Sequence, residues 1–310
     1  MLARIAQELF WLGRNLARAE STARLLEGVF QADLQGAPDE ASATHLGWDS
    51  LTHIMGGAKN GAVPARREAV LDALTRDPDN PASVVACVAR AREGAQAVCD
   101  VISAEMWEAI NTTHLRLRDG DLAATRLASG PYSIYQHVKE RSALFWGLTG
   151  RTMLRDEASA FLAAGGLIES ADMVLRMLRV ALPAGDDGDA ADGQAIALLQ
   201  AVGGFQAYRR AVPAPAHAKP VARFLLFERN YPDSVAAAVD SLNRALQTAD
   251  GSPRNSEPIL RLSRLSADLE FRRSAEGDAD LRVTCQEVQR ELGLVDKDIA
   301  QRYFGGARAA

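Results

Sequence analysis

Apolar residues near the start of the chain repeat at intervals that alternate between four and three positions. The series is Ile5, Leu9, Leu12, Leu16, Ala19, Ala23, Leu26 and Phe30. This spacing places every member on one side of an α-helix and is typical of a helix that packs along another helix. The pattern therefore predicts one long helix over residues 2–33, which Gly36 and Pro38 end.

This first long helix has an echo in the second half of the chain. Gly13–Leu26 returns as Gly165–Leu178, 152 positions later, and Pro81–Val88 returns as Pro232–Val239, 151 positions later. Two matches at nearly one offset predict an internal duplication of about 150 residues. We therefore expect a single domain over 1–310, built from repeats of about 1–150 and 151–310 that a pseudo-twofold axis relates.

Helical periodicity and helix-starting residues divide the rest of the chain into further helices. Asn80 and Pro81 are expected to begin one helix, as N-cap and first helical residue, and Ser103 to cap another. The expected ranges are 45–55, 81–102, 104–118, 131–154, 155–182, 194–211, 221–228, 232–249, 257–274 and 279–304. No convincing strand pattern occurs, so the predicted class is all-α, with about ten helices in one body.

Composition narrows the class of protein. Of the 310 residues 47% are hydrophobic, enough for a substantial core, and the net charge is −5 with no run of Lys or Arg, so we expect no nucleic-acid partner. The three cysteines form no paired motif, which favours buried thiols and a cytoplasmic protein. No apolar stretch approaches the roughly 18 residues that span a bilayer, so no membrane partner is expected.

Signals for cofactors and metals are weak. The loop Gly56–Pro64 contains Lys59 but lacks the Gly-Lys-Ser/Thr ending of a phosphate-binding loop. The five histidines are scattered, and the acidic loop Pro183–Gly193 lacks the terminal Glu of a calcium loop. We therefore expect neither a cofactor nor a metal.

The two long helices carry matching pairs of opposite charge. Glu20 and Arg24 sit at the margin of the apolar seam on the first helix, and Asp172 and Arg176 take the same places on the second. An acid four residues before an Arg is the favoured helical ion pair. One interpretation is an ion pair that only stabilises a helix interface; the other is that both pairs converge to bind an anionic or zwitterionic substrate.

Several segments spread over the chain resemble one bacterial family. They are Met1–Leu26, Asp79–Val84, Ala89–Glu93, Ser103–Asn111, Gly147–Glu157, Phe224–Val235 and Arg302–Gly305. Together they resemble the alpha-E domain family, an all-helical domain named for a Glu-Arg motif. The resemblance covers essentially the whole chain and implies the same all-helical fold.

The family's pattern on each long helix is similar to Gly-Arg-x-Leu-Glu-Arg-Ala-Glu/Asp. The first copy here keeps Arg14 and Arg18 but has Ala17 in place of the Glu. The second keeps Glu169 but has Gly166 and Ser170 in place of the two Arg residues. The Glu-Arg pair thus survives only as Arg18 and Glu169, one from each half, which suggests a composite site.

The resemblance also implies partners, because alpha-E proteins are encoded beside, or fused to, circularly permuted ATP-grasp proteins, with transglutaminase-like proteases and proteasome-like hydrolases as further neighbours. It implies a component of a system that forms or modifies amide or peptide bonds together with an ATP-grasp ligase, which would bind the ATP. A non-catalytic helical scaffold is the alternative, and autonomous catalysis is a third. Whether the chain is itself an enzyme stays open.

Candidate site residues follow from both arguments. In the first hypothesis the residues line a polar cleft between the repeats, where the Arg residues recognise a carboxylate and the acids orient the substrate or transfer protons. The catalytic candidates are Arg18, Glu169, Glu20 and Asp172. Further binding candidates flank these four along the long helices or stand at two helix starts. They are Arg14, Arg24 and Arg176; Glu105, Trp107 and Asn111; and Arg155, Asp156 and Glu157. The literal pair Glu228-Arg229 lies near a predicted helix end and is interpreted as a coincidence.

Overall fold

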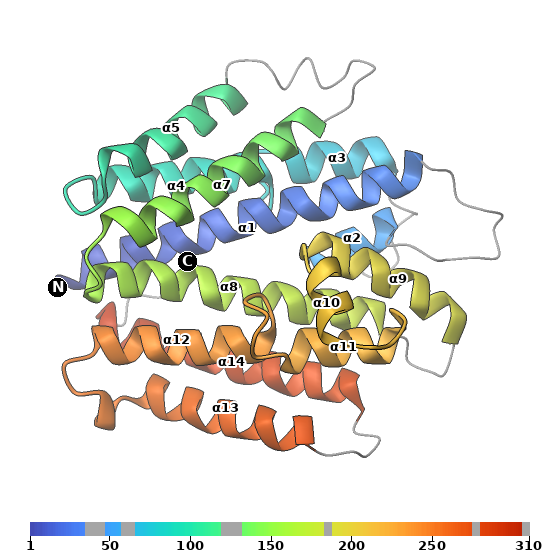
Figure 1. The fold of residues 1–310 in the computed structure, drawn as a ribbon. Coiled ribbons are helices and arrows are strands. Elements are labelled where there is room, and N and C mark those ends of the chain that lie inside the picture. The colour runs from blue at the N-terminus through green and yellow to red at the C-terminus, as the bar shows by residue number, and fades with distance from the viewer. Residues whose placement is uncertain (35–46, 57–65, 119–131, 183–187, 275–279, 306–310) are drawn as a thin grey trace.

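The computed structural model describes residues 1–34, 47–56, 66–118, 132–182, 188–274 and 280–305. These residues form thirteen α-helices and one 3₁₀ turn, with no strand among them, so the all-α class is confirmed and the helices exceed the number expected (Figure 1). The first half contains α1 (Ala3–Leu34), α2 (Trp48–Ile54), α3 (Arg67–Thr75), α4 (Val84–Ala97), α5 (Ala104–Arg118) and α7 (Tyr132–Thr152). The second contains α8 (Glu157–Ala181), α9 (Gly188–Ala201), α10 (Phe205–Ala211), α11 (Ala218–Phe227), α12 (Val235–Ala249), η1 (Pro253–Asn255), α13 (Glu257–Ser274) and α14 (Leu281–Tyr303).

The two long helices, α1 and α8, pack along each other at the centre of the molecule, as predicted (Figure 1). Two glycines allow their backbones to touch. A Cβ atom on Gly13 would lie 2.1 Å from the carbonyl oxygen of Leu162, and one on Gly165 would lie 1.8 Å from that of Phe10. Neither position has room for any side chain, so glycine is required at both.

The glycine contacts are reciprocal between the two halves. Gly13 meets Leu162, and Gly165 meets Phe10, so each contact becomes the other when 152 is added to the number of the α1 residue and subtracted from that of the α8 residue. Around this centre, α4 and α7 pack on α1 while α12 and α14 pack on α8, and α5 and α13 complete the two groups. Matched packing of this kind supports the internal duplication, which stays a prediction.

The helix that follows Asn80 begins three residues later than predicted. The side chain of Asn80 accepts a hydrogen bond from the Ala82 amide and donates one to the Ala73 carbonyl, so it closes a turn. Ser83 is the N-cap of α4, because its Oγ accepts from the Ala86 amide at 3.1 Å. The predicted cap at Asn80-Pro81 is therefore wrong, whereas Ser103 caps α5 as expected, accepting from the Met106 amide.

The same cap stands at the start of α12 in the second half. Ser234 Oγ accepts from the Ala237 amide at 3.1 Å and donates to the Glu228 carbonyl at 2.6 Å. In the first half Ser83 Oγ likewise donates to the Asp77 carbonyl, at 2.5 Å. The two halves therefore enter these helices by the same local geometry.

Other boundaries also differ from the predictions. The helix expected over 194–211 is two helices, because the chain turns at Gly203, where φ is +68°, and at Gly204. α9 begins at Gly188, inside the expected acidic loop, and α3 was not predicted at all. The Gly56–Pro64 loop lies outside the described residues from position 57 onward. Cys87 and Cys285 are buried as expected, but Cys99 is exposed.

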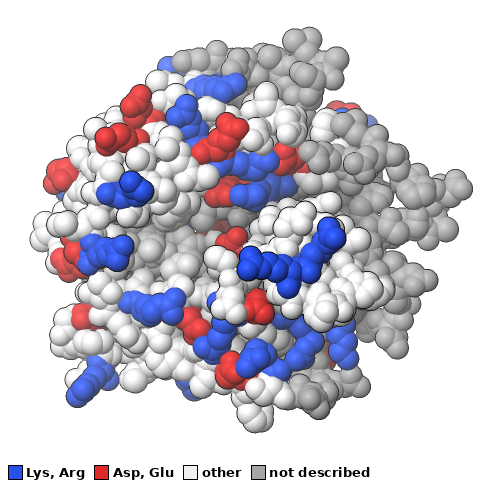
Figure 2. Space-filling view, viewed as in Figure 1, with Lys and Arg blue, Asp and Glu red and all other residues white. Residues whose placement is uncertain are grey.

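One helix, α8, is long and apolar enough to cross a membrane by length and composition, contrary to the expectation that no stretch would qualify. Most of its apolar segment is buried against other helices of the fold, which is typical of a core helix. The face of the molecule in Figure 2 mixes positive and negative side chains rather than gathering one sign.

Candidate functional site

Three of the residues predicted from the two long helices meet in one ion cluster on one side of the α1–α8 contact. Arg18 donates from Nε to Glu169 Oε1 at 2.5 Å and from a terminal nitrogen to Oε2 at 2.8 Å. Arg14 donates from Nε to Glu169 Oε2 at 2.9 Å. Its terminal nitrogen donates to both carboxylate oxygens of Asp296 on α14, at 2.8 and 2.9 Å. The predicted meeting of Arg18 and Glu169 is therefore present, and Arg14 and Asp296 join it.

The cluster is closed and largely dry. The side chain of Glu169 is 1% exposed, against 11% for Arg14 and 21% for Arg18. Burial favours the neutral acid, but the hydrogen bonds and charges of Arg18 and Arg14 outweigh it and lower the pKa of Glu169. Arg14 also lies over the ring of Trp11, with its guanidinium carbon 5.0 Å from the ring centroid. Glu169 is thus a fixed anion between two cations.

The second copy of the predicted charge pair lies beside this cluster. Asp172 accepts from Arg176 at 2.7 Å and from Gln289 of α14, also at 2.7 Å. The charge of Asp172 contributes to raising the pKa of Arg18, so the two residues are near enough to interact. Asp172 therefore helps to join α8 to α14.

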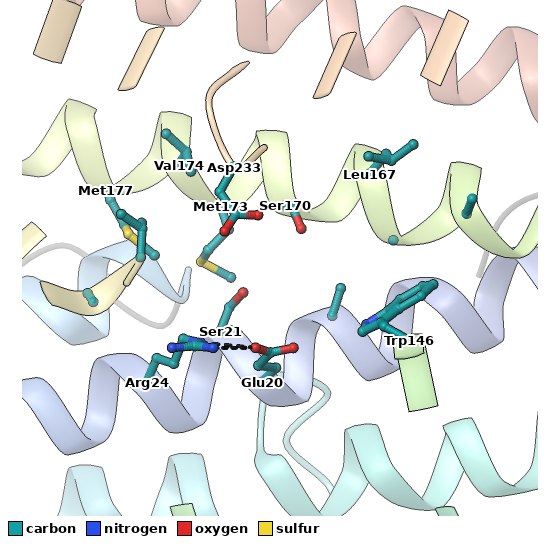
Figure 3. A pocket seen from close by; sticks show the side chains of 15 residues that line it. Glu20, Ser21, Arg24, Trp146, Leu167, Ser170, Met173, Val174, Met177 and Asp233 are labelled. Carbon is teal, nitrogen blue, oxygen red and sulfur yellow. Dashed lines mark hydrogen bonds and ion pairs between the residues drawn. The ribbon is translucent and has the colours of Figure 1, made fainter. Parts of the chain in front are cut away.

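A cavity of about 370 Å³ lies on the other side of the α1–α8 contact (Figure 3). Its apolar wall consists mainly of α8 side chains and Trp146 of α7. Glu20 and Arg24 line it from α1, and Arg24 donates from two nitrogens to Glu20 Oε1 at 3.0 and 2.7 Å. The other oxygen of Glu20 accepts from Ser142 Oγ at 2.5 Å. The first charge pair therefore lines the cavity, whereas Asp172 and Arg176 do not, so the expectation that the two pairs converge on one site is wrong.

Asp233, in the loop between α11 and α12, is a further acid at this cavity. Burial by the surrounding protein, followed by the negative charge of Glu20, raises the pKa of its carboxyl, and Arg24 opposes this. The residue is nevertheless accessible to solvent. Among the described residues, its side chain makes no hydrogen bond or ion pair. Asp233 was not predicted, since nothing in the sequence distinguishes it from other loop acids.

The cavity lies where the predicted duplication would place a second ion cluster. Under the offset of 152, Gly166 and Ser170 correspond to Arg14 and Arg18, and Ala17 corresponds to Glu169; all three line the cavity. Trp146 packs against Gly166, with a ring carbon 2.7 Å from the position of a Gly166 Cβ. In the ion cluster, Asp296 contacts Arg14, the counterpart of Gly166. The small residues in place of Glu and Arg leave space open, and Trp146 fills only part of it.

The remaining predicted residues lie elsewhere. Trp107 and Asn111 interact with Arg92 of α4, which donates to Asn111 Oδ1 at 2.8 Å and lies over the Trp107 ring, while Glu105 is exposed nearby at the start of α5.

Asp156 is the N-cap of α8, and Glu157 forms an ion pair with the amino group of Met1 at 2.7 Å. Arg155 is exposed. These three are about 18 Å along α8 from Glu169, so they do not join the cluster. Arg229 pairs with Asp240 and Glu270, also away from it. Within the described part of the chain, no group of three or more His, Cys, Asp or Glu residues is placed to hold a metal ion.

The decisive comparison is with protein families. The model of Alpha-E, described as a predicted alpha-helical domain with a conserved ER motif, matches residues 1–304. The chain belongs to the Alpha-E family. Within this Alpha-E chain, the residues that the resemblance assigns to the Glu-Arg motif, Arg14, Arg18 and Glu169, lie in the ion cluster, and that assignment stays a prediction.

The relatives that match this Alpha-E protein are named as uncharacterised proteins. It is 26% identical over 271 residues to the uncharacterised protein Rv2567 of Mycobacterium tuberculosis and 25% identical over the same length to Mb2597 of Mycobacterium bovis. Each match covers 82% of this chain but 31% of the relative, so the chain spans about a third of the length of these relatives. No solved structure matches it.

Proposed function

We propose that this Alpha-E chain is a component of a system that forms or modifies amide or peptide bonds together with an ATP-grasp ligase, and that the space between its two halves binds an anionic or zwitterionic substrate. The resemblance that names the family supports the partner, a circularly permuted ATP-grasp protein, with a transglutaminase-like protease as a further member. The single observation that supports substrate binding is the cavity beside α1 and α8, where a few polar side chains, Glu20 and Arg24 among them, lie in a mainly apolar wall.

Within this proposal the ion cluster positions helices rather than transferring protons. Glu169 already accepts three hydrogen bonds from two guanidinium groups, and its lowered pKa keeps it ionised near neutral pH. A general acid or base would need to exchange its proton near that pH. The cluster instead joins α1, α8 and α14, and so holds the wall of the cavity in place.

The lining of the cavity favours a zwitterion over a simple anion. Among the described residues that line it, Arg24 is the only basic one, and it is paired with Glu20, while Asp233 adds a further acid. A ligand that carried only negative charge would face two carboxylates in a partly apolar space. A ligand with an ammonium group and a carboxylate finds a partner for each.

The test of the partner is biochemical. The chain and a circularly permuted ATP-grasp protein of the same genome are co-expressed, and ATP hydrolysis is measured over a panel of amino acids with and without the chain. We expect a complex and an amino-acid-dependent increase in turnover. Absence of a complex, together with unchanged turnover over the whole panel, would remove the partner from the proposal.

A non-catalytic scaffold is the second candidate, and the closed ion cluster favours it. Every oxygen of Glu169 is satisfied within the protein, as in an ion pair that only fixes helix register. A scaffold would still form the complex, but blocking the cavity would not change turnover. Ser170→Leu, which places an apolar side chain in the cavity, separates the two candidates: a substrate site loses turnover, whereas a scaffold keeps it.

A further inference from the structure

We propose that the cavity between α1 and α8 binds the primary ammonium group of a compact ligand with an apolar body, and that Asp233 is the counter-ion of that ammonium. The inference rests on the proposed function that this space binds substrate, and it specifies the chemical class. The shared chemistry is a cationic amine on a hydrophobic body, whether it belongs to a free small molecule or to the amino terminus of a peptide.

The charges at the cavity do not balance. Arg24 and Glu20 neutralise each other through two hydrogen bonds, and the second oxygen of Glu20 is occupied by Ser142. Asp233 is left without a partner among the described residues. Among the described residues the lining therefore carries one uncompensated negative charge, and the ammonium group of a ligand would neutralise it.

The state of Asp233 points to the same ligand. The surrounding protein and the negative charge of Glu20 both disfavour ionisation and raise its pKa. The other ionisable groups near it are Arg24 on α1, which opposes this shift, and Tyr231. Tyr231 donates its hydroxyl to the Val202 carbonyl at 2.7 Å and is not available to Asp233. A bound ammonium would stabilise the ionised carboxylate.

The remaining residues of the lining indicate the polarity and size of the rest of the ligand. Trp146, Leu167, Met173, Val174 and Met177 give the cavity an apolar wall (Figure 3). A volume of about 370 Å³ is near the lower end of the range for small-molecule sites, so the ligand is compact.

Two serines give the wall further polar contacts. The hydroxyl groups of Ser21 and Ser170 lie at the cavity and can accept hydrogen bonds from an ammonium or donate them to a carbonyl oxygen next to it. An amine on a branched aliphatic body, with a carbonyl beside it, matches this combination.

The test uses the full chain and isothermal titration calorimetry at pH 7.5 with four probes that share one aliphatic body. Leucinamide is a cation, leucine is a zwitterion, 4-methylpentanoate is an anion, and Leu-Gly-Gly presents the same ammonium on a peptide. We expect leucinamide and leucine, which share the ammonium group, to bind, and 4-methylpentanoate not to bind. Binding of Leu-Gly-Gly beside leucinamide would identify a peptide terminus as a source, whereas leucinamide alone would identify a small amine.

Variants assign the binding to Asp233. Asp233→Asn removes the charge at nearly constant shape, and we expect it to weaken leucinamide binding by about tenfold to a hundredfold. Asp79→Asn, a matched change of an exposed acid in the loop before α4, is expected to bind as the wild type does. Binding to the wild type should also weaken as the pH falls and Asp233 takes up a proton.

Three results would overturn the inference: no binding of leucinamide to the wild type, equal binding to Asp233→Asn, or binding of 4-methylpentanoate as tight as that of leucinamide. Thermal unfolding of each variant shows whether it is folded. The experiment does not depend on the ATP-grasp partner. Amine binding without a complex removes only the proposed partner, and a complex without amine binding removes only this inference.

Discussion

The two sides of the α1–α8 contact differ: an ion cluster fills one side, and a cavity lies on the other. On one side Arg14, Arg18 and Glu169 form a largely buried ion cluster with Asp296. On the other side the corresponding residues are small, and the cavity has an acid with no hydrogen bond or ion pair among the described residues. Under the predicted duplication, Ala17, Gly166 and Ser170 are the counterparts of Glu169, Arg14 and Arg18, and all three line the cavity. The departures from the family's pattern therefore fall on one side of the contact, while the other side keeps its ion cluster.

The largest expected effect comes from the contact that both sides share. Gly165→Ala would place a Cβ atom 1.8 Å from the Phe10 carbonyl oxygen, and only separation of the two helices could relieve this. We expect a loss of more than about 4 kcal/mol in the free energy of unfolding, or no folded protein. Chemical denaturation followed by circular dichroism measures this.

Gly28→Ala is the control for that change. A Cβ atom at Gly28, on the same helix α1, would meet nothing within 4 Å. Alanine there should be neutral or stabilise the protein by up to about 1 kcal/mol. Equal effects of the two substitutions would mean that helix propensity, and not backbone contact, governs Gly165.

The next largest effect distinguishes the clustered side. Glu169→Gln leaves Arg14 and Arg18 buried without their shared carboxylate, and we expect the free energy of unfolding to fall by about 3 kcal/mol. Denaturant titration at pH 7 provides the measurement. Glu93→Gln, at an exposed acid on α4, should change stability by less than about 0.5 kcal/mol. If Glu169→Gln lowers the free energy of unfolding no more than Glu93→Gln does, the cluster does not stabilise the fold.

The pH dependence of stability tests the same cluster more finely. The folded pKa of Glu169 lies below its ordinary value of 4.5, so the unfolded chain binds the proton more readily. The contribution of Glu169 is therefore present above about pH 4.5 and is lost as the pH falls toward the folded pKa. The stability difference between the wild type and Glu169→Gln should shrink in that window. A difference that is constant from pH 7 to pH 3 would contradict the assignment.

The smallest expected effect, with the opposite sign, belongs to the cavity side. Asp233→Asn should change stability at pH 7 by no more than about 0.5 kcal/mol, toward stabilisation, because the removed charge is accessible but unpaired. The folded pKa of Asp233 lies above 3.8, so ionisation costs stability as the pH rises through that pKa. Matching pH profiles for Asp233→Asn and Glu169→Gln would abolish the contrast between the two sides.

Much of the fold could be predicted from the sequence, because helical periodicity is local. The seam from Ile5 to Phe30 predicts α1 to within one residue at each end, and the range 104–118 predicts α5 without error. The break between α9 and α10 was missed because the helical pattern is otherwise continuous, and the two glycines that mark the break were included in one helix. The cap at Ser83 was missed because Asn80-Pro81 is an equally good signal, and only the turn that Asn80 closes distinguishes them.

The site was predicted only in part. The family resemblance suggested a composite site of Arg18 and Glu169, one from each long helix, and the predicted pairing of these helices placed both at a shared interface. Asp296 could not be predicted, because its place depends on the rotation of α14 against α8. The cavity results from side chains that are missing, and whether Trp146 fills such a space is decided by packing between distant helices.

The glycine contact at the centre also has a consequence for how the chain is made. α1 ends at Leu34 and α8 begins at Glu157, so α1 leaves the ribosome well before the helix that covers its glycine face. Contacts so distant in sequence slow folding and leave apolar surface exposed in the meantime. Until α8 emerges, the nascent first half covers the seam of α1 mainly with α4 and α7, and we expect it to aggregate if translation stops there.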